Sequence, residues 1–147
     1  MVNTLKKDFN ARAVILMGHS GGATISANIL ALYPDTADAA LLVACGCDMA
    51  VIRARYYDRT GNPAWSIRTA SLDPMTSAHE VPADKKVRLA AGENDGIVNP
   101  EDIRRYADVL AANGVDVEMV VAPGRGHNRI LVDPLVFSYL DELVRAY

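Results

Sequence analysis

A glycine-flanked serine directly after an apolar run constrains this chain more than any other feature. Residues 13–17 read Ala-Val-Ile-Leu-Met, and residues 18–22 read Gly-His-Ser-Gly-Gly. Consecutive apolar residues without alternation predict a strand that is covered on both faces, as in a parallel sheet between helices. Residues 23–32 then carry apolar side chains at helical spacing until Pro34, whose ring prevents further helix. The pattern predicts a strand, a tight turn and a helix.

The tight turn has the G-x-S-x-G spacing of a nucleophile elbow, with Ser20 at its centre. Glycines on both sides relieve the crowding of such a strained turn. The backbone N–H of Gly21 would lie at the amino end of the following helix, where it can stabilise a negatively charged oxygen. The same spacing can be only a tight connection, but its place between a buried strand and a helix favours catalysis by Ser20.

Three further apolar runs predict strands, and a helical pattern follows each of them. The runs are residues 38–44, 87–91 and 115–121, and the helical patterns begin near residues 49, 100 and 134. Strands that alternate with helices predict an α/β fold, with a mostly parallel sheet of about four strands flanked by helices. We expect one domain over residues 1–147, with an amphipathic helix over residues 1–9.

Residues 64–75 show no clean period and contain the only tryptophan, Trp65. Two interpretations stay open at this point. The segment can be an excursion that faces substrate, or a crossover that packs Trp65 on the sheet.

The composition excludes two classes of partner. The chain is 50% hydrophobic and 22% charged, as expected of a protein with a folded core. Its net charge of −3, with both signs scattered, offers no basic stripe for nucleic acid. No apolar run approaches the roughly 18 residues of a membrane span, and the N-terminus lacks the apolar core of a signal peptide.

Cys45 and Cys47 are separated by a single residue. This spacing is short for a disulfide, and no further cysteines could complete a zinc site. We therefore expect two small buried thiols, which fit a reducing, cytoplasmic compartment. No motif indicates a metal, nucleotide or other cofactor.

Side chains with catalytic chemistry follow three of the predicted strands. Ser20 follows the first, Asp95 the third and His127 the fourth. Because the carboxyl ends of parallel strands meet at one edge of a sheet, these residues are expected to lie together. A serine hydroxyl needs a base to take its proton, and the imidazole needs an acid to orient it. We expect Ser20 as nucleophile, His127 as base and Asp95 as acid.

Other residues compete for two of these roles. Asp48 also follows a strand and is the alternative acid to Asp95. His19 is locked inside the elbow, where it cannot face the serine hydroxyl, and His79 lies near the segment without a period. His127 is therefore the favoured base. If the chain is not catalytic, Asp95 is only a turn former and His127 only a solvated loop residue.

The order Ser20, Asp95, His127 around this elbow resembles the α/β-hydrolase superfamily. The Gly-Glu-Asn-Asp turn at 92–95 and the Gly-Arg-Gly-His loop at 124–127 are similar to its esterase and prolyl-oligopeptidase-like groups. The resemblance implies a serine hydrolase of esters, or of peptide or amide bonds, that forms an acyl-enzyme and needs no cofactor. Gly21 and His19 would then lie on the oxyanion and substrate side.

The resemblance covers only the C-terminal half of that fold, from the elbow onward. The strands before the elbow, and the loop that supplies the second oxyanion N–H in that fold, are expected to be missing. The loss of one such donor costs about 2.7–4 kcal/mol of transition-state stabilisation. The alternative function is therefore a catalytically weak or inactive truncated module that acts through assembly.

A bare edge on the strand at 13–17 would favour such assembly, because exposed strand edges recruit other strands. We expect a homodimer with antiparallel elbow strands, or a partner polypeptide that carries the front half of the sheet.

Overall fold

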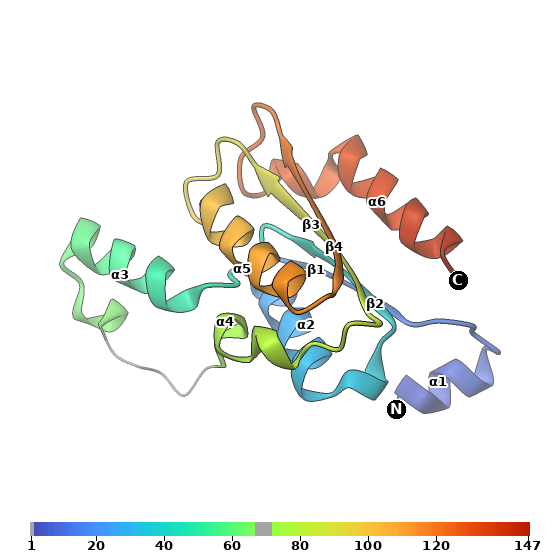
Figure 1. Ribbon diagram of the computed structural model, residues 1–147. Coiled ribbons are helices and arrows are strands. Elements are labelled where there is room, and N and C mark those ends of the chain that lie inside the picture. Colours follow the sequence, from blue (N-terminus) through green and yellow to red (C-terminus); the bar gives the residue numbers. More distant parts are fainter. Residues whose placement is uncertain (1, 67–71) are drawn as a thin grey trace.

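The computed structural model describes residues 2–66 and 72–147, and a parallel sheet of four strands lies at its centre (Figure 1). The strands are β1 (Ile15–His19), β2 (Ala39–Val43), β3 (Lys86–Gly92) and β4 (Asp116–Ala122). Their order in the sheet, β1-β2-β3-β4, is also their order in the chain. In register, Ile15 pairs with Ala39, Ala39 with Lys86, and Lys86 with Asp116. The structure confirms the predicted parallel α/β sheet.

Helices cover both faces of the sheet (Figure 1). They are α1 (Val2–Asp8), α2 (Gly21–Leu32), α3 (Met49–Thr60), α4 (Pro74–Ser77), α5 (Pro100–Ala112) and α6 (Pro134–Arg145). Helices α2 and α5 pack on one face, and α6 packs on the other. Short 3-10 turns lie at Pro34–Thr36, Pro63–Trp65, Ala78–Glu80 and Arg129–Val132.

Strand β2 explains how one apolar run serves both layers. Successive side chains of a strand point to opposite faces. Accordingly Leu42 joins the core under α2 and α5, whereas Leu41 and Val43 join the core under α6. All five residues of β2 are buried, as expected of an interior strand covered on both sides.

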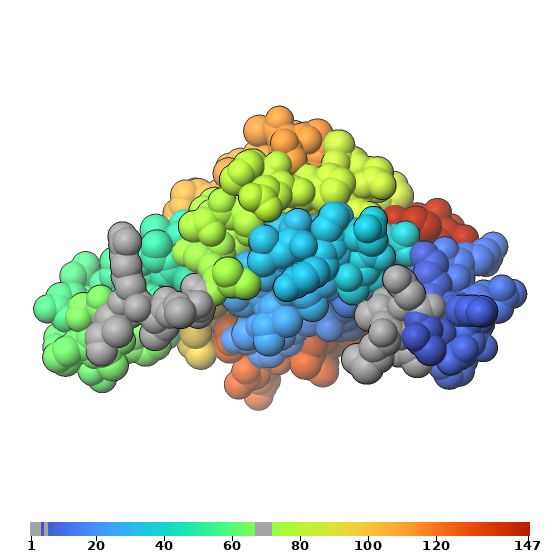
Figure 2. All heavy atoms as spheres, turned by 90° about the horizontal axis from the view of Figure 1, so that it is seen from below, coloured from blue at the N-terminus to red at the C-terminus, as the bar shows by residue number. Residues whose placement is uncertain are grey.

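Helix α3 extends away from the sheet, and Figure 2 shows α3 and α1 at opposite ends of the molecule. The helix continues to Thr60 and stops at Gly61, which has a left-handed φ of 63°. Trp65 then stacks on Tyr56, with ring centroids 4.7 Å apart. Trp65 therefore packs on α3 and not on the sheet. The part of the aperiodic segment at 67–71 lies outside the described residues.

The expectation of two free thiols is wrong, because Cys45 and Cys47 form a disulfide. Ala44 adopts a positive φ of 48° at the end of β2, and the turn brings the two Cα atoms to 5.1 Å. This separation lies within the range that a disulfide needs. Both cysteines are fully buried. The argument from spare thiols to a cytoplasmic location therefore has no basis in the structure.

Over residues 2–66 and 72–147, no helix has the length and apolar character needed to cross a membrane. The same residues hold no group of three or more His, Cys, Asp or Glu side chains placed to bind a metal ion.

Candidate active site

Ser20 stands at the turn between β1 and α2, in a backbone conformation that serine rarely adopts. Its φ is 53° and its ψ is −118°, a strained combination for a residue with a side chain. Gly18 makes the turn sterically feasible, because a Cβ at this position would overlap the carbonyl group of Gly22. The N–H of Ser20 donates to the carbonyl oxygen of Val43, 2.9 Å away on β2. The strained turn is therefore fixed to the sheet.

Three of the predicted site residues meet at the carboxyl edge of the sheet. Nε2 of His127 lies 2.9 Å from Oγ of Ser20, and Nδ1 of His127 lies 2.8 Å from Oδ2 of Asp95. The side chain of His127 is 11% exposed, and that of Asp95 is completely buried. An uninterrupted chain of hydrogen bonds therefore runs from the buried carboxylate to the serine hydroxyl.

Asp95 uses both carboxylate oxygens within this arrangement. Oδ1 accepts hydrogen bonds from the backbone N–H groups of Ile97 and Val98, at 2.8 and 2.9 Å. Oδ2 is left for His127. Because an ionised carboxylate only accepts hydrogen bonds, it favours the imidazole tautomer with its proton on Nδ1. Nε2 is then free to accept a proton from Ser20.

The loop that carries His127 is tied to the turn after β3. A Cβ at Gly92 would lie 2.5 Å from the carbonyl oxygen of Arg125, so only glycine permits this close approach. The N–H of Asn94 donates to the same oxygen at 2.8 Å. Arg125 in turn donates from Nε to Asp133 at 2.6 Å. The pKa of Asp133 is lowered, first by the backbone N–H of Leu135 and then by the Arg125 guanidinium.

The remaining predicted residues lie in different places. Gly21 begins α2 directly beside Ser20, so its N–H belongs to the first turn, where helix amides have no partner within the helix. His19 does not face the serine hydroxyl; its Nε2 lies 2.8 Å from the carbonyl oxygen of His127. His79 lies in the turn Ala78–Glu80 with its side chain 70% exposed.

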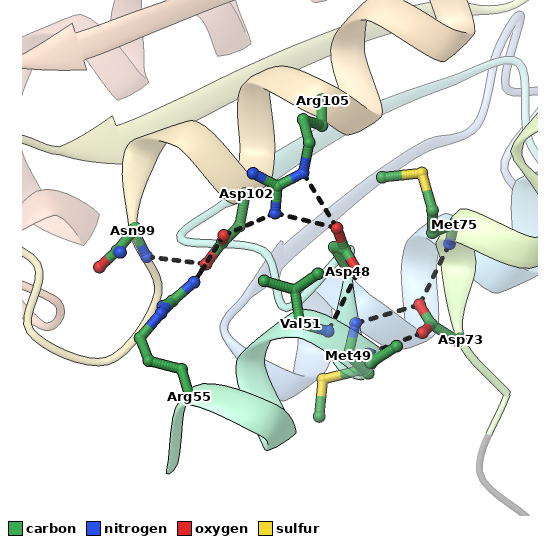
Figure 3. Close-up of polar contacts among 10 residues, drawn as sticks. Asp48, Met49, Val51, Arg55, Asp73, Met75, Asn99, Asp102 and Arg105 are labelled. Atoms are coloured by element: carbon green, nitrogen blue, oxygen red, sulfur yellow. Dashed lines mark hydrogen bonds and ion pairs between the residues drawn. The ribbon is translucent and has the colours of Figure 1, made fainter. Parts of the chain in front are cut away.

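Asp48, the alternative acid, takes part in a separate network (Figure 3). Oδ1 of Asp48 accepts the N–H of Val51 at the start of α3, and Oδ2 accepts Arg105 of α5 at 3.0 Å. Arg105 also donates a hydrogen bond to Asp102. Arg55 of α3 donates a second hydrogen bond to Asp102, at 2.6 Å. The two carboxylates raise the pKa of Arg105, Asp48 having the larger effect. The network joins α3 to α5, and the structure places Asp95, not Asp48, against His127.

A cavity of about 340 Å³ opens beside the serine. It is lined by Ser20, Gly21, Thr24, Gly46, Met49, Ile52, Tyr56, Trp65, Ile97 and Val98. None of these side chains is charged, and the stacked rings of Tyr56 and Trp65 form one wall. Such a cavity accepts an apolar group next to the serine hydroxyl.

Sequence reasoning missed most of this lining. The apolar positions of the helical pattern after residue 49, together with the lone tryptophan, were the available signals. Met49, Ile52 and Tyr56 recur on one face of α3 at helical spacing, and that face turns toward Ser20.

Residues 3–135 match the sequence model of the prolyl oligopeptidase family. The chain belongs to the prolyl oligopeptidase family. No curated protein matches the sequence.

Solved structures with the same fold include an esterase of Pyrococcus furiosus, at 17% identity and a TM-score of 0.75. A protein of unknown function from Agrobacterium tumefaciens matches at 23% identity and a TM-score of 0.63. An acylaminoacyl peptidase of Pyrococcus horikoshii matches at 15% identity and 0.67, with 88% of this chain covering 24% of that chain.

The chain is shorter than these solved proteins. The matches to the Pyrococcus furiosus esterase and to the Agrobacterium protein each cover 99% of this chain, but only 59% and 57% of those two chains. The chain therefore spans less than two thirds of their length.

Proposed function

We propose that this chain forms the nucleophile-bearing part of a serine hydrolase that cleaves carboxylic esters, or peptide or amide bonds. The hydrogen-bond chain from Ser20 through His127 to Asp95 is the observation that carries the proposal. Its distances fit those that nucleophilic catalysis requires between a hydroxyl, a base and an orienting acid. Membership of the prolyl oligopeptidase family supports the same class of reaction.

In this mechanism Ser20 Oγ attacks the carbonyl carbon of the substrate while His127 Nε2 takes the hydroxyl proton. Asp95 stabilises the imidazolium that forms. The N–H of Gly21 faces the developing oxyanion from the amino end of α2, where the helix dipole also favours negative charge. His127 then gives its proton to the leaving group, and an acyl-enzyme remains on Ser20. Water, activated by the same imidazole, releases the acid.

The apolar cavity beside Ser20 supports a substrate with an uncharged, apolar group next to the scissile bond. The cavity of about 340 Å³ has room for a short aliphatic or an aromatic group. A charged group there would lose its hydration without gaining a partner of opposite charge. We therefore propose apolar acyl or side-chain groups as the substrate class.

The second candidate is a module of low or no activity that functions through assembly. In the proposed mechanism the elbow provides one oxyanion donor, the N–H of Gly21 at the start of α2. A missing second donor would lower the turnover but would leave the serine–histidine pair in place.

A fluorophosphonate probe separates the two candidates, because it reacts with an activated serine and needs no specific substrate. We expect stoichiometric labelling of the wild type and none of Ser20→Ala. Ser138→Ala, which changes an exposed serine of α6, is the matched control and should label like the wild type. Absence of labelling in a folded wild type would favour the inactive module, and labelling of Ser20→Ala would show that the nucleophile is another residue.

A further inference from the structure

His19 precedes Ser20 in the elbow, and its ring contacts the loop that supplies the base. Nε2 of His19 lies 2.8 Å from the carbonyl oxygen of His127. The two rings are tilted by 50°, with their centroids 5.0 Å apart. Because a carbonyl oxygen only accepts hydrogen bonds, Nε2 of His19 must carry the donated proton.

The hydrogen bond from His19 acts on the backbone of His127, whereas those with Asp95 and Ser20 act on its side chain. The side chain of His127 is held at Nδ1 by Asp95 and at Nε2 by Ser20. Within residues 2–66 and 72–147, the hydrogen bond from His19 is the only one that reaches the backbone of His127. The two residues before His127 make backbone hydrogen bonds of their own. The carbonyl oxygen of Arg125 accepts the N–H of Asn94, and the carbonyl oxygen of Gly126 accepts the N–H of Ile130.

We propose that His19 is a positioning residue of the hydrolase: it fixes the backbone of His127 so that Nε2 stays within hydrogen-bond distance of Ser20. The inference rests on the proposed function. His19 ends β1 and Ser20 follows it at the strained turn, so the nucleophile is adjacent in the chain to the residue that binds the backbone of His127. A shift of the imidazole by about 1 Å is enough to lower the rate about 100-fold.

Two substitutions separate the hydrogen bond from the packing of the ring. His19→Gln keeps an amide donor at a similar reach, whereas His19→Leu keeps apolar bulk and removes the donor. With the p-nitrophenyl ester of a short aliphatic acid, we expect His19→Leu to lower kcat about 10- to 100-fold with little change in KM. His19→Gln should retain most of the wild-type kcat. His79→Leu, which changes an exposed histidine, is the control and should behave like the wild type.

A second measurement does not depend on turnover. The proton on His127 Nδ1, which Asp95 holds at 2.8 Å, should give a low-field proton NMR signal in the wild type. We expect this signal to weaken or broaden in His19→Leu and to persist in His19→Gln. An equal loss of thermal stability in both variants would indicate a structural role and overturn the proposal. So would an unchanged NMR signal and kcat in His19→Leu.

The failure of this inference is distinguishable from failure of the proposed function. If the wild type neither turns over the ester nor reacts with a fluorophosphonate, the proposed activity fails. The NMR comparison of His19→Leu with His19→Gln still decides whether His19 holds the imidazole in place.

Discussion

The side chain of Asp95 is more deeply buried than that of His127. The Asp95 side chain is completely buried, and three hydrogen bonds end on its two oxygens, two from backbone N–H groups and one from His127. Buried carboxylates need such partners, because an unpaired buried charge is expensive. The same three bonds fix the direction from which Asp95 holds the imidazole. Removal of the charge should therefore affect the rate much more than the fold.

We predict that Asp95→Asn lowers kcat by up to about 10⁴-fold, as in serine proteases with the equivalent change. The amide can donate to Nδ1 and thus favours the tautomer with its proton on Nε2, which cannot accept a proton from Ser20. Steady-state kinetics with an activated ester measure the loss, and circular dichroism checks that the protein is folded.

Asp48→Asn is the matched control for the acid. Asp48 is bonded to Arg105 and to the N–H of Val51, away from the imidazole. We expect a lower melting temperature, from the loss of about 1–3 kcal/mol of charged hydrogen bonding, with kcat unchanged. A large fall in kcat for Asp48→Asn, with Asp95→Asn fully active, would assign the acid to the position after β2.

The positions of Ser20, Asp95 and His127 could be predicted because each follows a strand, and strand ends are visible in local hydropathy. The contact of His19 with His127 could not. It joins residues 108 positions apart, and its donor was visible in the sequence only as a histidine inside the elbow. Local patterns locate residues on elements, whereas such contacts depend on how the loops pack together.

At the scale of elements, the geometry of the elbow depends on the missing side chain of Gly18. Strand β1 must pass directly into α2 with Ser20 at a positive φ. The close approach of Gly18 to the carbonyl group of Gly22 is the consequence. Both contacting groups are backbone, so neither can move aside without breaking the turn.

We predict that Gly18→Ala destabilises the protein by about 3 kcal/mol or more, since overlap with rigid backbone cannot relax cheaply. Gly22→Ala is the matched control in the same motif. A Cβ at Gly22 meets nothing within 4 Å, and alanine favours helix by up to about 1 kcal/mol over glycine. Urea unfolding of the two variants should therefore give changes of opposite sign, and equal stabilities would contradict the elbow geometry.

Most elements were predictable because their periodicity is local. The strands lie within two residues of the predicted runs. Pro100 and Pro134 occupy the first turns of α5 and α6, where proline is tolerated. The disulfide was not predictable, since it depends on the backbone conformation of the turn after β2, which brings the two Cα atoms to 5.1 Å. The stacking of Trp65 on α3 likewise depends on where the chain turns after Gly61.

At the scale of the whole molecule, β1 and β4 form the two edges of the sheet, and the edge at β1 lies beside the elbow. The N–H of Ser20 and the carbonyl oxygen of Val14 bond toward β2. Residues of a parallel strand alternate in the side to which their backbone groups point, so Ile15, Met17 and His19 point to the open side. Within the described ranges, no hydrogen bond reaches the backbone N–H or C=O of these three residues.

Apolar side chains are exposed on β1 and on α2, which packs against β1. Met17 on β1 is 40% exposed, and Ile25 and Tyr33 on α2 are 63% and 64% exposed. A groove of about 310 Å³ runs over α2, and its lining is almost entirely apolar; Figure 2 shows this helix on the face between α1 and α3. Exposed apolar surface beside an unpaired strand is typical of an interface.

We predict that the chain forms a homodimer through antiparallel pairing of two β1 strands. With the two-fold axis at Met17, the outward residues pair as Ile15 with His19 and Met17 with Met17 of the partner, so that every open backbone group gains a partner. The two serine sites then lie at opposite ends of the joint sheet, and neither gains an oxyanion donor. Dimerisation should therefore stabilise the fold without raising kcat.

Met17→Lys tests this arrangement, because it places two like charges directly opposite each other at the axis. Sedimentation at micromolar concentration should give a dimer for the wild type and a monomer for Met17→Lys. Val144→Lys, which changes an exposed apolar residue of α6, should remain dimeric. The backbone amides of Ile15, Met17 and His19 should exchange slowly in the dimer and rapidly in the Met17→Lys monomer. A wild-type monomer whose three amides become protected only when a polypeptide carrying additional strands is added would contradict the homodimer and identify the open edge as the docking site of that partner.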